Sequence, residues 1–279
     1  GGYEGTGNID VYPRFCSPEN GDYFLAENSP AVGNGENGSN MGALGVGCGP
    51  IGPVWYISNT GSDDIGDGSE EGPFATIQKG IDEALDGDTV LVSAGIYYEN
   101  LMIWKNILVI GESRDATIID GQNSGRCVDM GNGATISTLS AINGETPNGA
   151  PAIKCMGGNI ENIIVANNKS NNGPGYIPNG TVIAENSTVL KNVIFYNNES
   201  WISGVETSGN VQILNCLFYD NFELIDDSDD NSSIVFHKNG VLNIDETTFY
   251  NNQSNVVFFN DNGAEFRVIN SIIYSNLSN

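Results

Sequence analysis

The sequence is poor in positive charge and in histidine. It holds 10 Lys and Arg against 35 Asp and Glu, with a single His among 279 residues, so the formal net charge is −25. So few cations argue against nucleic-acid binding, because they cannot offset a phosphate backbone, and an anionic membrane surface is disfavoured for the same reason. One His and no cysteines at zinc-ligand spacing disfavour a zinc site.

Long apolar runs are also missing. No stretch approaches the ~20 apolar residues that cross a bilayer, so we expect no membrane insertion. The chain begins at Gly1 without a charged and apolar leader, and we interpret it as a processed chain, a fragment or one unit of something longer. Hydrophobic residues still make up 39% of the chain, enough for a sizeable core in one large domain or two small ones.

The cysteines are odd in number, so at least one of the five has no partner within the chain. Cys16 and Cys48 flank a Gly/Asn-rich stretch and are the best disulfide candidates. Cys216 lies within an apolar strand pattern, which favours a buried thiol. The acidic, Asn/Gly-rich and Lys-poor composition is typical of an extracellular or cell-surface setting.

An internal repeat runs through the last 120 residues. Its units are marked by five anchors, separated by 30, 23, 31 and 24 residues: Asn168, Asn198, Asn221, Asn252 and Asn276. The residue three before each anchor is apolar in every unit. The residue six before is Asn in four of the five units: Asn162, Asn192, Asn215, Glu246 and Asn270.

The repeat unit resembles a set of short strands rather than a helix. No 3.6-residue period links its apolar positions, and β-branched and aromatic runs alternate with Asn/Gly turns. One such unit cannot bury its own apolar face, but stacked units can, with strands pairing in parallel ~4.8 Å apart. We therefore predict that Phe195, Phe218 and Phe249 stack inside. The Asn residues six before the anchors should lie at a bend in left-handed conformation, bond their neighbours above and below, and have a structural role.

A short helix is predicted over 75–86. Ile77, Ile81 and Leu85 are four residues apart, and Ala84 shares their face. Further strands follow this segment. A helix placed before the first of them can cover the open end of a solenoid core.

Several segments between 51 and 130 resemble the opening of secreted right-handed parallel β-helix proteins, the pectate-lyase-like superfold. They are WYISNTGSD at 55–63, GPFATIQ at 72–78, GDTVLV at 87–92, GIYYEN at 95–100 and TIIDG at 117–121. The resemblance implies an all-β, right-handed parallel β-helix with one short capping helix. The opening coils would span 51–130 and the repeated coils 131–279.

Residues 1–50 resemble the closing coils of such proteins, although they come first here. The segments concerned are GTGNID at 5–10, ENGDYFL at 19–25, NSPAV at 28–32 and NMGAL at 40–44. This permuted order implies a tandem array or a filament in which one subunit lends its first segment to its neighbour, and such head-to-tail contacts grow into fibres. The alternative is an ordinary domain whose N-terminal extension folds back on itself.

Catalytic residues do not cluster in the sequence. Lyase chemistry needs a base with a cation or metal, and hydrolysis needs two facing carboxylates. The ten cations are spread along the chain, and His237 and Lys238, as neighbours on a strand, should point to opposite faces. We therefore expect a non-enzymatic structural protein, a subunit or repeat of an extracellular fibre whose partner is itself. The alternative is a carbohydrate-active or glycan-binding β-helix, with a polysaccharide lyase as the chemistry.

Calcium is the one cofactor that the sequence suggests. Two loops are dense in carboxylates, which are the oxygen ligands that calcium takes. Solvated acidic loops are the alternative interpretation. The candidate ligands are Asp63, Asp64, Asp67, Asp226, Asp227 and Asp229.

Two further residue classes have possible roles at the surface. Trp55, Trp104 and Trp201 could stack on sugars, although packing in the core or at an interface is the more common role. Asn-x-Ser/Thr triplets, which also arise by accident in an Asn-rich chain, mark glycosylation candidates. They start at Asn37, Asn168, Asn179, Asn186, Asn198, Asn231, Asn252 and Asn276.

Overall fold

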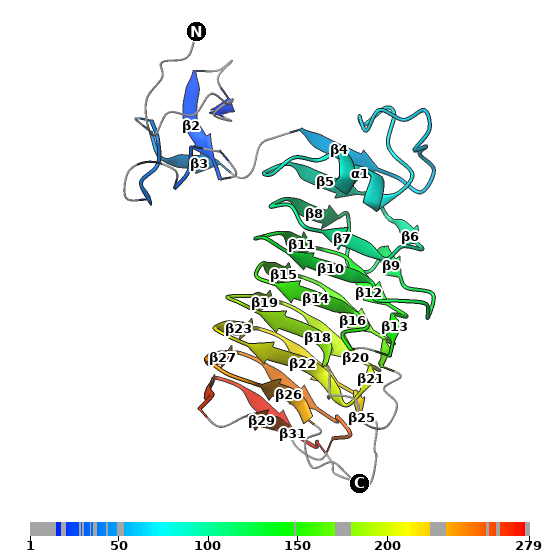
Figure 1. Ribbon diagram of the computed structural model, residues 1–279, viewed down its shortest axis with the longest axis vertical. Coiled ribbons are helices and arrows are strands. Elements are labelled where there is room, and N and C mark those ends of the chain that lie inside the picture. The colour runs from blue at the N-terminus through cyan, green and yellow to red at the C-terminus, as the bar shows by residue number, and fades with distance from the viewer. Residues whose placement is uncertain are drawn as a thin grey trace.

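The chain folds into a stack of parallel coils (Figure 1). The computed structural model describes residues 15–17, 21–27, 29, 31–33, 35, 38–42, 44–48, 53–147, 149–170, 180–223, 233–254, 257–260 and 263–276. Four sheets run along the stack, and every strand in them pairs in parallel with its neighbours in the coils before and after. The prediction of a parallel β-helix is confirmed.

Sheets I and II begin each coil. Sheet I contains, in spatial order, β30 (Glu265–Ile269), β27 (Val241–Asp245), β23 (Val211–Leu214), β19 (Val189–Lys191), β15 (Asn159–Glu161), β11 (Thr135–Ser137), β8 (Leu108–Gly111), β5 (Thr89–Val92) and β4 (Val54–Ile57). Sheet II contains β31 (Ile272–Tyr274), β28 (Thr248–Tyr250), β24 (Leu217–Tyr219), β20 (Ile194–Tyr196), β16 (Ile164–Ala166), β12 (Ser140–Ile142), β9 (Thr117–Asp120) and β6 (Gly95–Tyr97).

Sheets III and IV complete the coils. Sheet III contains β29 (Phe258–Asn260), β26 (Ser233–His237), β22 (Ile202–Ser208), β18 (Gly180–Glu185), β14 (Ile153–Met156), β10 (Val128–Gly131) and β7 (Leu101–Ile103). The short sheet IV contains β13 (Glu145–Thr146), β17 (Lys169–Ser170), β21 (Glu199–Ser200) and β25 (Phe222–Glu223).

The core is a set of columns of like side chains. Phe195, Phe218 and Phe249 pair in register on β20, β24 and β28, and none is exposed to solvent. The ring centroids of Phe195 and Phe218 are 4.3 Å apart, and those of Phe218 and Phe249 are 4.8 Å apart. The predicted internal stack is confirmed, and its spacing matches that of neighbouring strands.

The bends between sheets I and II have left-handed backbone angles, as predicted. The φ angles lie between 48° and 57° at Asn162, Asn192, Asn215, Glu246 and Asn270. Asn tolerates this conformation because its short side chain can bond locally. The Asn215 amide nitrogen donates to the Asn192 side-chain oxygen at 2.8 Å, so part of the expected bonding between coils is present.

A longer asparagine ladder lies inside the stack, at the anchor positions. Asn168, Asn198, Asn221 and Asn252 are fully buried, and each side-chain nitrogen donates to the side-chain oxygen of the next anchor at 2.8–3.0 Å. The same oxygen also accepts from the backbone N–H of the preceding anchor. The bonding along the stack that was predicted for the residues six before the anchors is present there in part, but the anchors form the longer ladder.

Helix α1 (Ile77–Glu83) covers the first coil. Its N-terminus is capped by the side chain of Thr76, which accepts from the backbone N–H of Lys79. Ile77 and Ile81 are buried against the core, and a Cβ atom at Gly80 would lie only 2.5 Å from Cδ1 of Ile57 on β4. The helix therefore lies directly on the first coil.

The predicted position of Leu85 on the buried face is wrong. The helix ends at Glu83, and Ala84 has extended backbone angles, so the fourfold spacing does not continue. Leu85 is 71% exposed, whereas Ala84 is buried. No helix in the part of the chain that the structure describes is long and apolar enough to cross a bilayer.

The N-terminal segment forms a small sheet of its own. β1 (Phe15–Ser17) pairs antiparallel with β2 (Asp22–Ala26), and β2 pairs parallel with β3 (Val46–Cys48). A disulfide joins Cys16 and Cys48. In Figure 1 this sheet lies at the β4 end of the stack, and the chain's C-terminus lies at the other end.

The other three cysteines are buried free thiols. Burial raises the pKa of Cys127 and Cys216 to about 12 and that of Cys155 to about 11. Because the thiolate is the reactive form, these thiols should resist alkylation at pH 8 while the protein is folded. Iodoacetamide with mass analysis should find no modified Cys in the native protein and three after unfolding without reductant. Modification of any of the three in the folded state would contradict this assignment.

The asparagine ladder should carry a measurable share of the stability. Asn198→Ala would remove the oxygen that accepts from the Asn168 backbone N–H and side-chain nitrogen, and it would also remove the donor to the Val165 carbonyl, inside the core. We expect a loss of about 2–4 kcal/mol in the free energy of unfolding, measured by denaturant titration. Asn197→Gly is the matched control, because Asn197 is exposed with a positive φ that glycine adopts freely, and it should stay within about 0.5 kcal/mol of the parent. Equal effects of the two changes would contradict a special role for the ladder.

Candidate functional site

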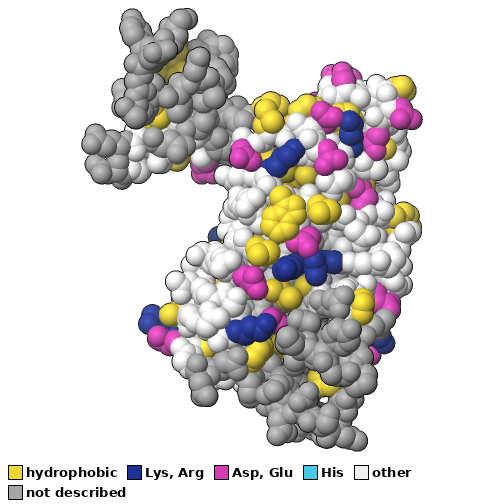
Figure 2. All heavy atoms as spheres, viewed as in Figure 1, with side chains coloured by type: hydrophobic (Ala, Val, Ile, Leu, Met, Phe, Trp, Pro, Cys, Tyr) yellow, Lys and Arg dark blue, Asp and Glu magenta, His cyan; other side chains and the backbone are white. Residues whose placement is uncertain are grey.

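The outer face of sheet III gathers carboxylates, cations and apolar side chains from many coils. One column on it contains, by strand register, Met102, Asp129, Lys154, Ile183, Glu206 and Phe236. A second column, two residues further along each strand, contains Trp104, Gly131, Met156, Glu185, Ser208 and Lys238. Figure 2 shows hydrophobic, acidic and basic side chains following one another down one face of the stack. We call the two columns together the sheet III face.

Glu206 is the most unusual residue on this face. It lies on β22 between Ile183 and Phe236 of the neighbouring strands, and its side chain is only 3% exposed. Its Oε1 atom is ion-paired with the ammonium group of Lys238, while its buried Oε2 atom has no hydrogen-bond partner. Burial raises the pKa of the Glu206 carboxyl, and the nearby Glu185 carboxylate adds to this, although Lys238 partly offsets it. The environment thus favours a protonated carboxyl more than water does.

Glu185 provides a second carboxylate beside it. It ends β18, in register with Ser208, so it lies one coil before Glu206 and two residues further along the strand direction. Strand spacing and residue rise place the two backbones about 8 Å apart. Two neighbouring carboxyl groups in different environments, one buried and one partly exposed, are the arrangement that lets one act as an acid and the other as a base.

An apolar platform lies further along the same face. Trp104 is 41% exposed, and its ring rests on Gly131, where a Cβ atom would come within 2.7 Å of it. Met102 and Met156 beside it are also exposed. Arg126 and Asp129 form an ion pair next to this platform. A flat indole with polar groups at its border suits a sugar ring, which has both apolar C–H faces and hydroxyl edges.

The other two tryptophans are not available for stacking. Trp201 is 9% exposed. Trp55 stacks on Phe74, with ring centroids 5.9 Å apart, and its indole nitrogen donates to Asp88 at 3.2 Å. Trp55 and Trp201 therefore have a packing role, and Trp104 is the tryptophan that is exposed enough to stack on a sugar.

His237 and Lys238 lie on opposite sides of the strand, as predicted. His237 points inward, is fully buried and shares a hydrogen bond of 2.9 Å between Nδ1 and the Thr207 hydroxyl. Burial lowers its pKa. Lys238 points outward to Glu206. The group of Glu185, Glu206 and Lys238 could not be recognised from the sequence, because its members are 21 and 32 residues apart (206 − 185 and 238 − 206) and only the coil stacking brings them together.

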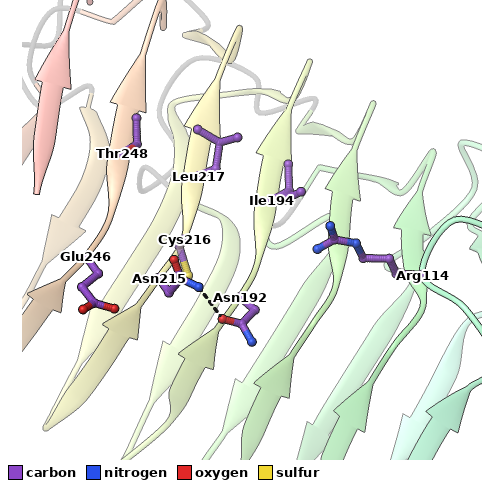
Figure 3. A pocket seen from close by; sticks show the side chains of 8 residues that line it. All are labelled: Arg114, Asn192, Ile194, Asn215, Cys216, Leu217, Glu246 and Thr248. Carbon is purple, nitrogen blue, oxygen red and sulfur yellow. Dashed lines mark hydrogen bonds between the residues drawn. The ribbon is translucent and has the colours of Figure 1, made fainter.

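A separate pocket of about 280 Å³ lies on another side of the stack, along the bend between sheets I and II (Figure 3). Arg114, Asn192, Asn215 and Glu246 line it together with outward residues of sheet II. Figure 3 shows Asn215 bonded to Asn192, while Arg114 and Glu246 lie at opposite ends. Glu246 is the one carboxyl among its described lining residues, so the pocket by itself offers no pair of carboxylates.

The first acidic loop uses its carboxylates within the fold. Asp63 accepts hydrogen bonds from the backbone N–H groups of Ala75 and Thr76 and from the Thr76 hydroxyl, at 2.6–3.1 Å. Burial opposes ionisation of Asp63, but these bonds outweigh it and lower its pKa. Asp67 accepts from the N–H of Ser69 at 3.0 Å. Within the described ranges, no three His, Cys, Asp or Glu residues are grouped for a metal ion.

The second acidic loop, with Asp226, Asp227 and Asp229, lies outside the described residues. Calcium in either loop, including at Asp64, stays a prediction.

Burial divides the glycosylation candidates. Asn168, Asn198 and Asn252 belong to the buried ladder, and Asn276 extends it, so their amide nitrogens are engaged inside the stack. We therefore predict that these four triplets carry no glycan on the folded chain, because the modified nitrogen would have to leave the ladder. Asn186 is exposed at a turn after β18. Asn37, Asn179 and Asn231 lie outside the described residues.

The comparisons with known proteins find similar structures but no relatives by sequence. No family model matches the chain, and no curated protein matches it. A pectin methylesterase variant solved in complex with a hexasaccharide is 10% identical, with a TM-score of 0.46, over 80% of this chain and 90% of its own. A GH136 lacto-N-biosidase from Eubacterium ramulus is 13% identical, with a TM-score of 0.34, over 72% of this chain and 44% of its own. At these levels the likeness shows the fold alone.

The expectation of a chain without enzymatic activity is corrected. The solved structures that resemble this fold are, by name, enzymes: a pectin methylesterase and a lacto-N-biosidase. The physical reason is that groups which are neighbours in space need not be neighbours along the chain. Stacking assembles Glu185, Glu206 and Lys238 from three different coils.

Glycan occupancy should follow burial. If the chain is produced in a host that attaches N-linked glycans, the folded product should carry one at Asn186 and none at Asn168, Asn198 or Asn252. Peptide mass spectrometry with and without glycosidase treatment measures this. A glycan on any of the three buried ladder residues in folded protein would contradict the structure of the ladder.

Proposed function

We propose that the chain is a carbohydrate-active β-helix whose saccharide site is the sheet III face. The observation that carries the proposal is the buried Glu206 carboxyl, which has a raised pKa, a buried Oε2 atom without a hydrogen-bond partner and a second carboxylate, Glu185, on the preceding coil. A buried polar atom without a partner costs stability, and such atoms are retained where a ligand or a reaction uses them. Trp104 on the same face supplies a stacking surface for a sugar ring.

The reaction that this arrangement supports is hydrolysis of a glycosidic bond. When the Glu206 carboxyl is protonated, its proton lies on Oε2, because Oε1 already accepts from Lys238. Glu206 gives that proton to the leaving oxygen as the bond to the anomeric carbon breaks, and water supplies the new oxygen. The Glu185 carboxylate balances the positive charge that develops on the sugar and accepts a proton from the water. Two carboxyl groups in these roles are the usual equipment of glycoside hydrolases.

The charge of the molecule favours a neutral glycan over an acidic one. A net charge of −25 repels uronate polymers. Of the cations on and beside this face, Lys238 and Arg126 are paired with Glu206 and Asp129, which leaves Lys154 of the first column as the one without an ion pair among the described residues. Lyase chemistry on uronates, the reaction considered from the sequence, needs a free cation or a metal at this place. Hydrolysis of a neutral glycan does not.

An extracellular setting agrees with this function. The Cys16–Cys48 disulfide is of the kind that persists in oxidising compartments, where most polymeric glycans are also found.

The site is tested with substitutions of the two carboxylates. On a panel of neutral oligosaccharides, Glu206→Gln and Glu185→Gln should each lower kcat by about 10²–10⁴-fold, because general acid–base steps contribute this much. Glu161→Gln is the matched control, since it makes the same change on the outer face of sheet I and should leave kcat unchanged. Trp104→Ala should raise KM and leave kcat nearly unchanged. Full activity in both carboxylate variants would contradict this location of the site. The absence of turnover and binding across the whole panel would contradict the proposed function.

The pH profile provides a second test. Glu206 acts while protonated, and its pKa is raised in the folded protein, so kcat/KM should fall as pH rises through that raised value. Lys238→Met should raise the pKa of Glu206 further, because it removes the charge that opposes the effect of burial, and it should shift this alkaline limb to higher pH. An alkaline limb that stays in place in Lys238→Met would contradict the role of Glu206.

A further inference from the structure

Among the described residues, no strand lies beyond the last coil of the stack. β30 and β31 are the end strands of sheets I and II. Val268 and Ile273 pair in register with Ile244 and Phe249, which point into the core and have no exposure. Val268 and Ile273 are nevertheless 38% and 51% exposed. The side chains that should form the next layer of the core therefore lie open at this end.

The first coil, in contrast, is closed. Helix α1 lies over its core, and the outer edge of β4 is paired with the loop that follows it. Tyr56 donates its backbone N–H to Gly68, Phe74 donates to Tyr56, and Ser58 donates to Phe74, at 2.9–3.0 Å. The two ends of the stack differ, with a closed edge at β4 and an open edge at β30 and β31.

The asparagine ladder stops at the open end as well. Asn276 accepts from Asn252 and donates to the Phe249 carbonyl, exactly as the earlier anchors do. In each earlier repeat, an Asn of the following coil accepts from the anchor's backbone N–H. In the described part of the chain the ladder ends here, so this edge fits one further coil.

The N-terminal segment, defined here as residues 15–48, has the character of such a coil. Its strands β2 and β3 pair in parallel, with Leu25 opposite Val46, 21 residues later. The last coils of the stack have a similar spacing of 24 residues between Thr248 and Ile272. Among its described residues, the segment exposes four large apolar side chains, each 41–52% exposed: Tyr23, Phe24, Leu44 and Val46. Its sheet shares no strand with sheets I–IV.

The segment cannot reach the open end of its own stack. β4 and β30 are the outermost of nine strands in sheet I, so eight spacings of ~4.8 Å place them ~38 Å apart. The linker from Cys48 to Val54 has six residue-to-residue spacings and spans at most ~21 Å, and the width of the three-stranded N-terminal sheet extends this reach by ~10 Å. The total is shorter than the distance between β4 and β30. The N-terminal segment of the same molecule therefore falls short of this edge, whereas the segment of a second copy is free of that limit.

We propose that the N-terminal segment of one copy docks on the β30–β31 edge of a second copy and continues its core. The contact joins two different surfaces, so each docked molecule presents a new open end and chains grow head to tail. Parallel strand addition supplies main-chain bonds, and the exposed apolar side chains of the two surfaces supply the buried area. Each copy carries a net charge of −25, so repulsion opposes the contact and added salt strengthens it. This interaction is independent of the glycan site on the sheet III face.

The full chain and three single substitutions test the proposal by sedimentation velocity. Ile273→Asp alters the open end, Val46→Asp alters the segment, and Ile96→Asp is the control, since Ile96 is 46% exposed on the outer face of β6. The parent should form larger species as concentration and salt rise. Ile273→Asp and Val46→Asp should each weaken association at least tenfold, and Ile96→Asp should behave as the parent. Circular dichroism melting confirms that all four are folded.

A mixing experiment distinguishes head-to-tail docking from a symmetric contact. The Ile273→Asp chain keeps an intact segment, and the Val46→Asp chain keeps an intact open end. Their mixture should form a discrete dimer that does not grow, whereas each variant alone stays monomeric. A parent that remains monomeric at every concentration and salt level would overturn the proposal. So would a folded Ile273→Asp chain that assembles like the parent, or an assembling parent whose mixed variants form no dimer.

Discussion

The structure depends on a single constraint, which is that no coil of this chain can bury its own apolar side. Each coil has short strands and tight bends, and its inward residues become core only when the next coil covers them. The columns of Phe195, Phe218 and Phe249 and of the ladder asparagines are the direct result. Stacked aromatic rings supply the apolar contact, and the asparagines satisfy the backbone groups that the bends would otherwise leave without partners inside.

The same constraint determines what the outer surface can do. Residues that point outward also fall into columns, so groups some 20 to 30 residues apart become neighbours at the spacing of strands. On sheet III this places Glu185, Glu206 and Lys238 together, and it lines up an apolar platform on the same face. A flat, elongated face with repeating functional groups suits an elongated substrate such as a glycan. It also means that the last coil must leave its inward residues exposed unless something continues the stack.

Much of the fold could be predicted from particular residues. The spacing of the anchors predicted the coils, and the recurring phenylalanines predicted the internal column. The preference of Asn for left-handed backbone angles predicted the bends. Helix 75–86 was predicted in place, but Leu85 was assigned to the buried face because periodicity does not reveal where a helix ends. The bonds between bend asparagines were predicted in part, but the internal ladder at the anchors was not, since the sequence does not say which Asn of a repeat points inward. The candidate site was missed, because its carboxylates and cation are distant in sequence and no local pattern joins them.

The sequence by itself determined the architecture. Its apolar and Asn positions recur from unit to unit, and a single unit can bury its apolar positions only by stacking on its neighbours. It also determined the acidic character of the surface. Only the tertiary structure decided the environments: that Glu206 is desolvated, that the Asn168, Asn198 and Asn252 triplets are inside the ladder, and that one end of the stack is closed while the other is open. The physical reason is that a repeat pattern records which residues are equivalent. Burial, pKa and accessibility depend on what lies against each of them in space.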